Sequence, residues 1–407
     1  MSTTPETAIQ TSLLVRRGRL VDGRTVDVTI AGDRITAVTT VGPATADGFG
    51  PAAPLPVTES GPEWALPDPA RSTEPVPVVD ATGCLVLPGL VDAHVHLDKA
   101  LIGEPWQPHR RARDLAERIR LARDLQLHVV PTPLATRARR FAEQLLSYGT
   151  TAARSHVDVD PETGIASVMT ILELKRELTG RLAVQTVAFP QDGIVRSTGT
   201  IELLEEALRL GVDLIGGLDP AGLDGDRDTH LDVVFGLAHR FDVDIDVHLH
   251  EPGEMGLASI GAICDRAEAL GFQNRVAVSH AYCLAADEML VGPVIERLAR
   301  VGAQIITCAT PGRSVPPVQT LRAGGVRVLA GSDNVRDGWS PFGNGDMLER
   351  AMLIAYNSGW RADDELELAL RLATEEAATG LGLPDHGIEP GSRADLVIVP
   401  ASCAAEA

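Results

Sequence analysis

The sequence contains few lysines and few cysteines, and acidic residues outnumber basic ones. Lys99 and Lys175 are the only lysines, and 36 basic against 56 acidic residues give a formal net charge of -20. Binding to nucleic-acid phosphates requires a basic surface, so we expect no nucleic-acid partner. The five cysteines are odd in number and lack CxxC spacing, which disfavours a disulfide framework and a thiolate zinc site and indicates reduced thiols.

Long apolar segments are also missing. No run of about 18 apolar residues occurs, as a membrane-spanning helix would need. The first ten residues, MSTTPETAIQ, lack the basic segment followed by an apolar stretch that marks a secretory signal. Hydrophobic residues make up 44% of the chain and charged residues 23%, an ordinary globular balance. We therefore expect a soluble cytoplasmic protein with no membrane partner.

Both ends of the chain have the character of β-strands. Residues 12–40 contain short β-branched segments separated by DG and AGD turns, typical of consecutive hairpins. Residues 43–77 are rich in Pro, Ala and Gly and predict a long irregular segment. The segment HGIEPGSRADLVIVP, near the end, returns to strand character. We predict a small β-sandwich subdomain formed by residues 1–80 and 385–407, and it is left open whether this subdomain is complete.

The middle of the chain alternates short apolar runs with amphipathic segments. The eight runs are CLVLPGLVDAHVHLD, TTAARSHVDVD, LAVQTVAFPQD, VDLIGGLDP, DIDVHLHEPGE, RVAVSHAYC, QIITCATPG and VRVLAGSDN. Helical segments such as IELLEEALRLG and GPVIERLARVG lie between them. This alternation predicts an α/β fold, a (β/α)8 TIM-like barrel over residues 81–384. Polar residues gather at the C-terminal ends of the runs, where barrels build their active sites.

Histidines and acids occupy five of the eight predicted strand ends. His94 and His96 lie two residues apart and therefore share one face of the first strand. The other strand ends carry His156, His248 with Glu251, His280 and Asp333. Imidazole and carboxylate together suit zinc or ferrous iron, with one coordination position left open for water. A single histidine at a strand end is more often structural, but this convergence on one rim predicts a metal site.

These motifs resemble those of a known family. VDAHVHLDK, HLHE, SHA and GSDN are similar to motifs of the amidohydrolase superfamily. With HVDVD, AFPQDGI and SDNVRDGWSPFGNGDML they resemble the cytosine deaminase branch, over nearly the whole chain. The resemblance implies one divalent metal ion, Zn or Fe(II), bound by His94, His96, His248 and Asp333.

The resemblance also implies roles in catalysis. Glu251 would be the proton shuttle, His280 would hold or polarise the attacking water, and Gln191 would bind the amide-like edge of a heterocycle. Asp333 would act in catalysis as well as in metal binding. Each role is chemically consistent: a metal lowers the pKa of water towards 7, a carboxylate can protonate a ring nitrogen and then the leaving amine, and an amide offers a donor and an acceptor.

The scarcity of lysine bears on the number of metal ions. Many relatives bridge two metals with a carboxylated lysine at the end of strand four, which reads GGLDP here. Lys175 lies in ILELKREL, which predicts a helix, and Lys99 follows the first strand, where we expect a rim or structural residue. A mononuclear site follows.

The residues expected to choose the substrate depart from the pattern of cytosine deaminases. Asn334 stands where those enzymes usually carry an acid, and the surroundings of Glu251 also differ. We name Asn334, His250 and Trp339, beside Gln191, as candidate substrate contacts. For three further residues, a functional and a structural interpretation have similar weight. His156 either orients a ligand or packs in the core. Asp98 and Asp219 either line the pocket or shape loops.

Three functions remain open. The first is a metal-dependent deaminase of cytosine or a related cyclic amidine, supported by Gln191, Glu251 and His280. The second is a hydrolase of another non-peptide C–N bond, such as the alkylamine of an aminotriazine or a cyclic amide, supported by Asn334 and His250. The third, a non-catalytic scaffold, is disfavoured because every predicted ligand is present. The expected partner is a small heterocycle, and a homo-oligomer is compatible with the family.

Overall fold

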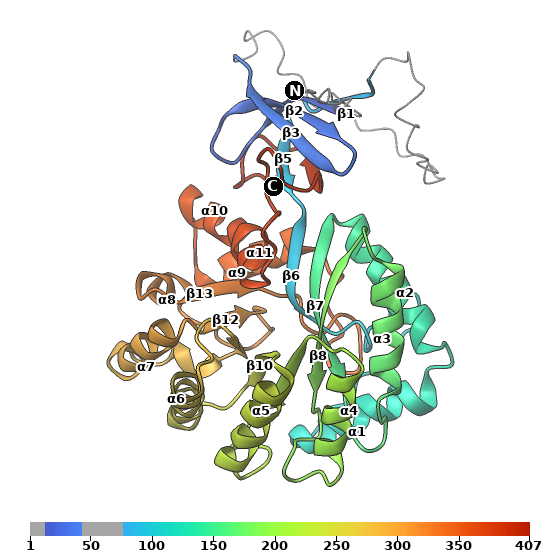
Figure 1. The fold of residues 1–407 in the computed structure, drawn as a ribbon, viewed down its shortest axis with the longest axis vertical. Helices are drawn as coiled ribbons and strands as arrows, with labels where there is room; N and C mark the ends of the chain where they lie inside the picture. Colours follow the sequence, from blue (N-terminus) through green and yellow to red (C-terminus); the bar gives the residue numbers. More distant parts are fainter. Residues whose placement is uncertain (1–12, 43–75) are drawn as a thin grey trace, which may run out of the picture. The chain divides into compact units, whose positions relative to one another are not determined.

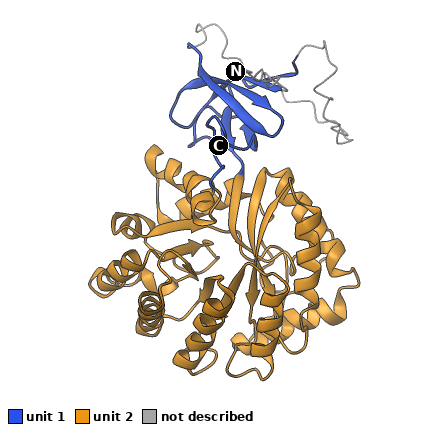
Figure 2. Ribbon diagram, in the orientation of Figure 1, with its two compact units in different colours: residues 1–89, 384–407 blue, residues 90–383 orange. Residues whose placement is uncertain are grey.

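The computed structural model describes residues 13–42 and 76–407 (Figure 1). These residues form two compact units, coloured separately in Figure 2. One unit holds the described residues up to Gly89 and Pro384–Ala407, and the other holds Leu90–Leu383. The sequence prediction put the first boundary at 80/81, whereas β5 (Leu85–Pro88) pairs with β14 (Leu396–Val399) in the smaller unit. The segment predicted to be irregular, 43–77, lies almost wholly outside the described residues.

The smaller unit contains one six-stranded sheet. Its order is β14-β5-β1-β2-β3, with β4 paired to β1; the remaining strands are β1 (Leu13–Arg19), β2 (Thr25–Ala31), β3 (Arg34–Thr40) and β4 (Val78–Asp80). The predicted hairpins are present, since β1, β2 and β3 pair antiparallel in succession. Alternate residues of β2, Val26, Val28 and Ile30, are buried in its core. The described strands join in a single hydrogen-bonded sheet, where the prediction was a two-sheet sandwich.

The larger unit contains the eight-stranded parallel barrel that the sequence predicts (Figure 1). The strands pair in chain order: β6 (Leu90–Val95), β7 (Thr150–Asp158), β8 (Ala183–Phe189), β9 (Leu214–Leu218), β10 (Asp244–Leu249), β11 (Val276–His280), β12 (Gln304–Thr307) and β13 (Arg327–Ala330). An isolated parallel bridge between Val95 and Asp333 links the last strand end to the first. The (β/α)8 prediction is confirmed, and the parallel direction of the strands brings their C-terminal ends to one side of the barrel.

Helices surround the strands on the outside of the barrel (Figure 1). They are α1 (Leu115–Asp124), η1 (Leu125–Val129), α2 (Leu134–Ser147), α3 (Ala166–Glu177), α4 (Thr200–Arg209), α5 (Arg227–Phe241), α6 (Gly253–Leu270), η2 (Tyr282–Ala285), α7 (Glu288–Val301), α8 (Val318–Ala323), α9 (Met347–Ser358), α10 (Asp363–Leu372) and α11 (Glu375–Gly380). In α4, Leu204, Ala207 and Leu208 form the buried stripe expected of an amphipathic helix. Among the described residues, no helix combines the length and the apolar character needed to cross a bilayer.

Candidate active site

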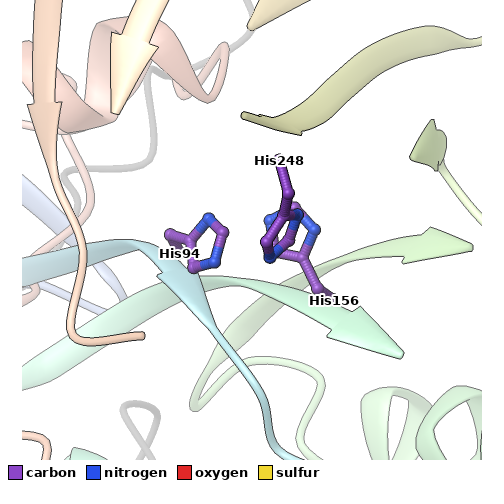
Figure 3. A group of neighbouring side chains, drawn as sticks. All are labelled: His94, His156 and His248. Atoms are coloured by element: carbon purple, nitrogen blue, oxygen red, sulfur yellow. The ribbon is translucent and has the colours of Figure 1, made fainter. Parts of the chain in front are cut away.

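Three histidine side chains from three barrel strands meet at the C-terminal ends of the strands (Figure 3). His94 lies on β6, His156 on β7 and His248 on β10, and all three are buried. The ring centroid of His94 is 4.0 Å from that of His156 and 4.5 Å from that of His248. One ligand nitrogen from each ring lies within 4.8 Å of the others, close enough for the group to hold a metal ion.

Asp333, His96 and His280 belong to the same cluster. Asp333 Oδ1 is 3.6 Å from His94 Nε2 and 3.5 Å from His96 Nε2. His94, His280 and Asp333 form a second group whose ligand atoms lie within 4.8 Å of one another. The structure therefore brings the four predicted ligands together, and it adds His156 at the point where the sequence left its role open.

Hydrogen bonds fix the direction in which the His94 and His96 rings present their lone pairs. Ser279 Oγ donates to Asp246 Oδ1 at 2.7 Å and therefore accepts from His94 Nδ1 at 2.8 Å. His96 Nδ1 lies 3.1 Å from the His156 carbonyl oxygen, which can only accept. Both rings thus carry their proton on Nδ1 and leave Nε2 free. Metal-binding histidines commonly have this second hydrogen bond, which orients the ring.

The electrostatics of the cluster suit a divalent cation. Burial, with a smaller effect of Lys99, lowers the pKa of His96 to about 3. Burial and neighbouring imidazoles hold the pKa of His248 well below its ordinary value. Burial alone would raise the pKa of Asp333, but the neighbouring His94 and His96 side chains hold it well below the usual range. Neutral imidazole and ionised carboxylate are the forms that bind metal.

Several buried nitrogen atoms of the cluster have no hydrogen-bond partner among the described residues. They are His94 Nε2, His280 Nε2 and both ring nitrogens of His156 and His248. Buried polar atoms are normally paired, so this concentration needs a chemical reason. A bound cation would satisfy the lone pairs, and nitrogen with carboxylate oxygen suits zinc or iron(II). The donor set therefore fits the group that the sequence predicts.

The backbone at the strand ends is unusual. His280 has a φ of 71°, Asp333 of 60° and Asp219 of 39°, all in the left-handed region. Gly331 permits the close approach of β13 to β6, because a Cβ there would lie 2.5 Å from His94 Cβ. Left-handed residues other than glycine concentrate at functional sites, where the surrounding structure holds them in place. These conformations bring Asp333 and His280 to the cluster.

The cluster borders a pocket with a volume of about 820 Å³. All predicted site residues line it except the fully buried His94: His96, Gln191, His248, His250, Glu251, His280, Asp333, Asn334 and Trp339. Asp219, for which the sequence left two interpretations, also lines it. Pockets for small ligands occupy about 300–1,000 Å³, so a substituted heterocycle fits this volume.

Glu251 is held by three donors. Its Oε1 accepts from the backbone N–H groups of Ala221 at 2.7 Å and Gly222 at 2.9 Å, and its Oε2 accepts from the Ser259 hydroxyl. The carboxyl group is buried but lines the pocket. For a role in proton transfer, one of its oxygens must exchange its present donor for the substrate, as catalytic groups in ligand-free sites commonly do.

His250 is fixed by Asp219. The carboxylate of Asp219 accepts from the His250 backbone N–H at 2.6 Å and from its Nδ1 at 3.0 Å. Burial would lower the pKa of His250, but the Asp219 carboxylate outweighs burial and raises it. The ring also stacks on His280 with centroids 4.4 Å apart. His250 therefore has a defined orientation in the pocket, beside the cluster of histidines and Asp333.

Lys99 is a pocket residue whose contacts the sequence analysis missed. It was expected at the rim or in a structural role, but it is 1% exposed and lines the pocket. Its Nζ lies 2.6 Å from Gln191 Oε1 and 2.9 Å from Asp158 Oδ1. Its position three residues after His96 was the available signal. Lys175, in contrast, lies on α3 as predicted and pairs with Asp213.

A model of the amidohydrolase family matches residues 110–406 of the chain. This protein belongs to the amidohydrolase family. The superfamily predicted from the motifs is therefore confirmed, together with the barrel fold.

Two relatives are named as hydrolases of N-isopropylammelide. N-isopropylammelide isopropyl amidohydrolase of Pseudomonas sp. (strain ADP) is 34% identical, over 79% of this amidohydrolase and 81% of that protein. The crystal structure of N-isopropylammelide isopropylaminohydrolase from Burkholderia multivorans is 38% identical, with a TM-score of 0.85, over 98% of this chain and 94% of that one. A 5-methylcytosine deaminase from Klebsiella pneumoniae has a TM-score of 0.80 at 24% identity, over 97% and 93% of the two chains, which shows a shared fold.

Proposed function

We propose that this amidohydrolase is metal-dependent and hydrolyses an exocyclic C–N bond on a nitrogen heterocycle. The observation that carries the proposal is one pocket that combines the imidazole and carboxylate cluster with the amide groups of Gln191 and Asn334. Such a pocket pairs an activated-water centre with groups that recognise ring edges. Water would add its oxygen to the ring carbon; one of its protons would leave with the amine and the other would stay on the ring.

An alkylamino-substituted triazine is the substrate class that we favour. Its support is the 34% and 38% identity to two N-isopropylammelide hydrolases, and Asn334 in place of the acid usual in cytosine deaminases. Cytosine or a related cyclic amidine is the second candidate, supported by the fold shared with 5-methylcytosine deaminase. Both reactions replace an exocyclic nitrogen by oxygen, so the same residues serve either one.

His94, His96, His248 and Asp333 would hold one Zn or Fe(II) ion. When bound, the ion would lower the pKa of water towards 7 and so make hydroxide available at neutral pH. His280 would orient the attacking water, and the buried Ser279 would keep the Nε2 of His94 turned toward the cluster. The surrounding side chains limit the access of bulk water, since the three histidine ligands are almost wholly buried.

Glu251 would move the protons. In the reaction it would pass one proton of the water to a ring nitrogen and the second proton to the leaving amine, work suited to a positioned carboxylate. Gln191 and Asn334 would hold the edges of the ring, and the indole of Trp339 would form an apolar wall of the pocket. His250 would contact the substrate near the reacting carbon.

The wider setting of the proposal comes from composition. Reduced, scattered cysteines favour a cytoplasmic location, and the negative charge disfavours nucleic-acid partners. A homo-oligomer remains a prediction. A non-catalytic scaffold is disfavoured because the predicted ligands lie together in the structure.

The test combines elemental analysis with product release on one preparation. Ammonia and isopropylamine would be measured with N-isopropylammelide, cytosine, 5-methylcytosine, isocytosine and creatinine. We expect isopropylamine from the triazine and about one metal ion per chain, the stoichiometry of a mononuclear site. Ammonia from a pyrimidine would select the second candidate. Absence of both metal and product would overturn the enzymatic proposal and leave the scaffold.

A further inference from the structure

The amide of Gln191 has a defined polarity in the pocket. Its Oε1 lies 2.6 Å from Lys99 Nζ, and an ammonium group can only donate hydrogen bonds. The contact therefore identifies the oxygen of the amide and leaves the NH2 group available. No described residue accepts from this NH2 group, and Gln191 lines the pocket. Gln191 thus presents a donor.

The amide of Asn334 has the opposite polarity. Its Nδ2 lies 2.6 Å from Asp337 Oδ2, and a carboxylate can only accept. Asp337 Oδ1 accepts from the backbone N–H groups of Trp339 at 2.8 Å and Ser340 at 2.9 Å, which holds the carboxylate in place. Asn334 Oδ1 has no donor among the described residues. Asn334 therefore presents an acceptor to the pocket that it lines.

Two buried charges enforce these orientations. Lys99 and Asp337 are each 1% exposed, and each influences the ionisation of the other. Asp158 holds the Lys99 ammonium at 2.9 Å. Turning either amide over would set NH2 against an ammonium or a carbonyl against a carboxylate. Such a mismatch removes a hydrogen bond from a buried charged group and sets like partial charges against each other, which is unfavourable.

We propose that Lys99 and Asp337 are positioning residues that set the hydrogen-bond polarity of the substrate site. Through them Gln191 reads an acceptor, such as a ring carbonyl oxygen, and Asn334 reads a donor, such as a ring N–H. The site is then selective for nitrogen heterocycles in their oxo form over fully amino-substituted rings. The inference rests on the proposed function for the identity of the site and extends it to two residues outside the metal centre.

The test compares two rings of equal size, uracil and 2,4-diaminopyrimidine. Their dissociation constants would be measured by calorimetry on the metal-loaded protein, at a pH where both rings are uncharged. Because both rings are uncharged, loss of a charged side chain does not by itself alter the ratio of the two dissociation constants. We expect the natural protein to prefer uracil by at least about tenfold, the scale of one mismatched hydrogen bond in a closed site.

Two variants should each lower this preference. Lys99→Met frees the Gln191 amide to rotate, so the preference for uracil should fall by at least about tenfold. In Asp337→Asn, the new amide can keep the two backbone donors on its oxygen and offer its NH2 to Asn334 Oδ1, which turns the Asn334 amide over. Both amides then donate, so the ring N–H that Asn334 accepts from in the natural protein meets an NH2 group, and the preference for uracil should fall. A merely structural role would weaken the binding of both rings alike and leave their ratio unchanged.

Lys175→Met is the matched control, because Lys175 is the other lysine of the chain and pairs with Asp213 on the helical side of the barrel. It should leave the preference unchanged. An unchanged or raised preference for uracil in either folded, metal-loaded pocket variant would overturn the proposal. Calorimetry needs no turnover, so a lowered preference in both variants of a protein that releases no amine would sustain the polarity proposal and refute the proposed function.

Discussion

The metal cluster and the amide wall of the pocket are built in different ways. The metal cluster, defined as His94, His96, His248, His280 and Asp333, comes from strand ends or the residues next to them. The amide wall, defined as Lys99, Gln191, Asn334 and Asp337, lies in the loops that follow β6, β8 and β13. Neutral imidazoles dominate the first, and buried full charges orient the second.

Under the proposed function, this difference would separate chemistry from substrate selection. Strand ends are held by the ladder of the barrel, which gives ligands the fixed distances that a metal requires. Loops tolerate sequence change, so the groups that recognise a ring can vary while the cluster stays the same. We therefore expect changes in the cluster to abolish activity and changes in the wall to alter which ring is bound.

The largest effect is expected from His248→Ala. This change removes a predicted ligand whose two nitrogens have no other partner among the described residues. Metal content should fall to background, and turnover should fall by more than the roughly 10–100-fold that loss of an outer partner causes. Elemental analysis and amine release are the measurements. His239→Ala, an exposed histidine of α5, should keep both. Full metal occupancy in His248→Ala would show that the ligand set is misassigned.

Glu251→Gln should separate proton transfer from metal binding. The amide oxygen can still accept from Ala221 and Gly222, and its NH2 group can donate to the Ser259 hydroxyl, so fold and metal content should be retained. Turnover should fall by at least about 10²-fold, the usual scale for removing a general acid or base. Glu254→Gln, exposed in the first turn of α6, is the control. Turnover at the natural rate would remove Glu251 from the mechanism and turn attention to His250.

Ser279→Ala tests how the cluster is oriented. Without its hydroxyl, His94 Nδ1 loses its acceptor and Asp246 loses a donor. Metal affinity should fall by about 10–100-fold, as for other outer partners of metal ligands, while the substrate preference stays the same. Titration against a competing chelator measures the first and calorimetry the second. Ser147→Ala, which removes an exposed hydroxyl of α2, is the control and should change neither metal affinity nor substrate preference. A natural metal affinity in Ser279→Ala would mean that the His94 ring is held by packing alone.

The sequence predicted the cluster better than the wall for a physical reason. His94 and His96 are two residues apart on a strand, so the period of the strand alone places them on one face. Lys99 and Gln191 are 92 residues apart, and no local pattern shows that an ammonium will meet that amide. Loop residues could therefore be predicted as candidate substrate contacts, but the partner of Lys99 could not.

Local sequence patterns likewise predicted only part of the fold. Eight apolar runs at strand spacing identified the barrel, because most residues of the strand in each run are buried. The first run, CLVLPGLVDAHVHLD, holds two strands that belong to different sheets, β5 and β6. Both are fully buried, so hydrophobicity does not separate them, and pairing with β14 decides the assignment.

The smallest effect is expected from Asp224→Asn, which loosens the loop that carries Gln191. Asp224 Oδ2 accepts from the backbone N–H of Ile194 at 2.9 Å and from His230 Nδ1 at 2.6 Å, and Asp224 Oδ1 accepts from the backbone N–H of Arg196 at 3.2 Å. An amide keeps only one accepting oxygen for these donors. Each hydrogen bond contributes about 0.5–1.5 kcal/mol net, so KM should rise by less than about tenfold.

The metal cluster does not touch Asp224, so metal content and kcat should stay at their natural values in Asp224→Asn. Steady-state kinetics and elemental analysis measure the two quantities together. Asp232→Asn, an exposed carboxylate of α5, is the control for loss of one negative charge. A fall in kcat with unchanged KM would show that the loop after β8 serves the chemistry, and the separation between the metal cluster and the amide wall would then fail.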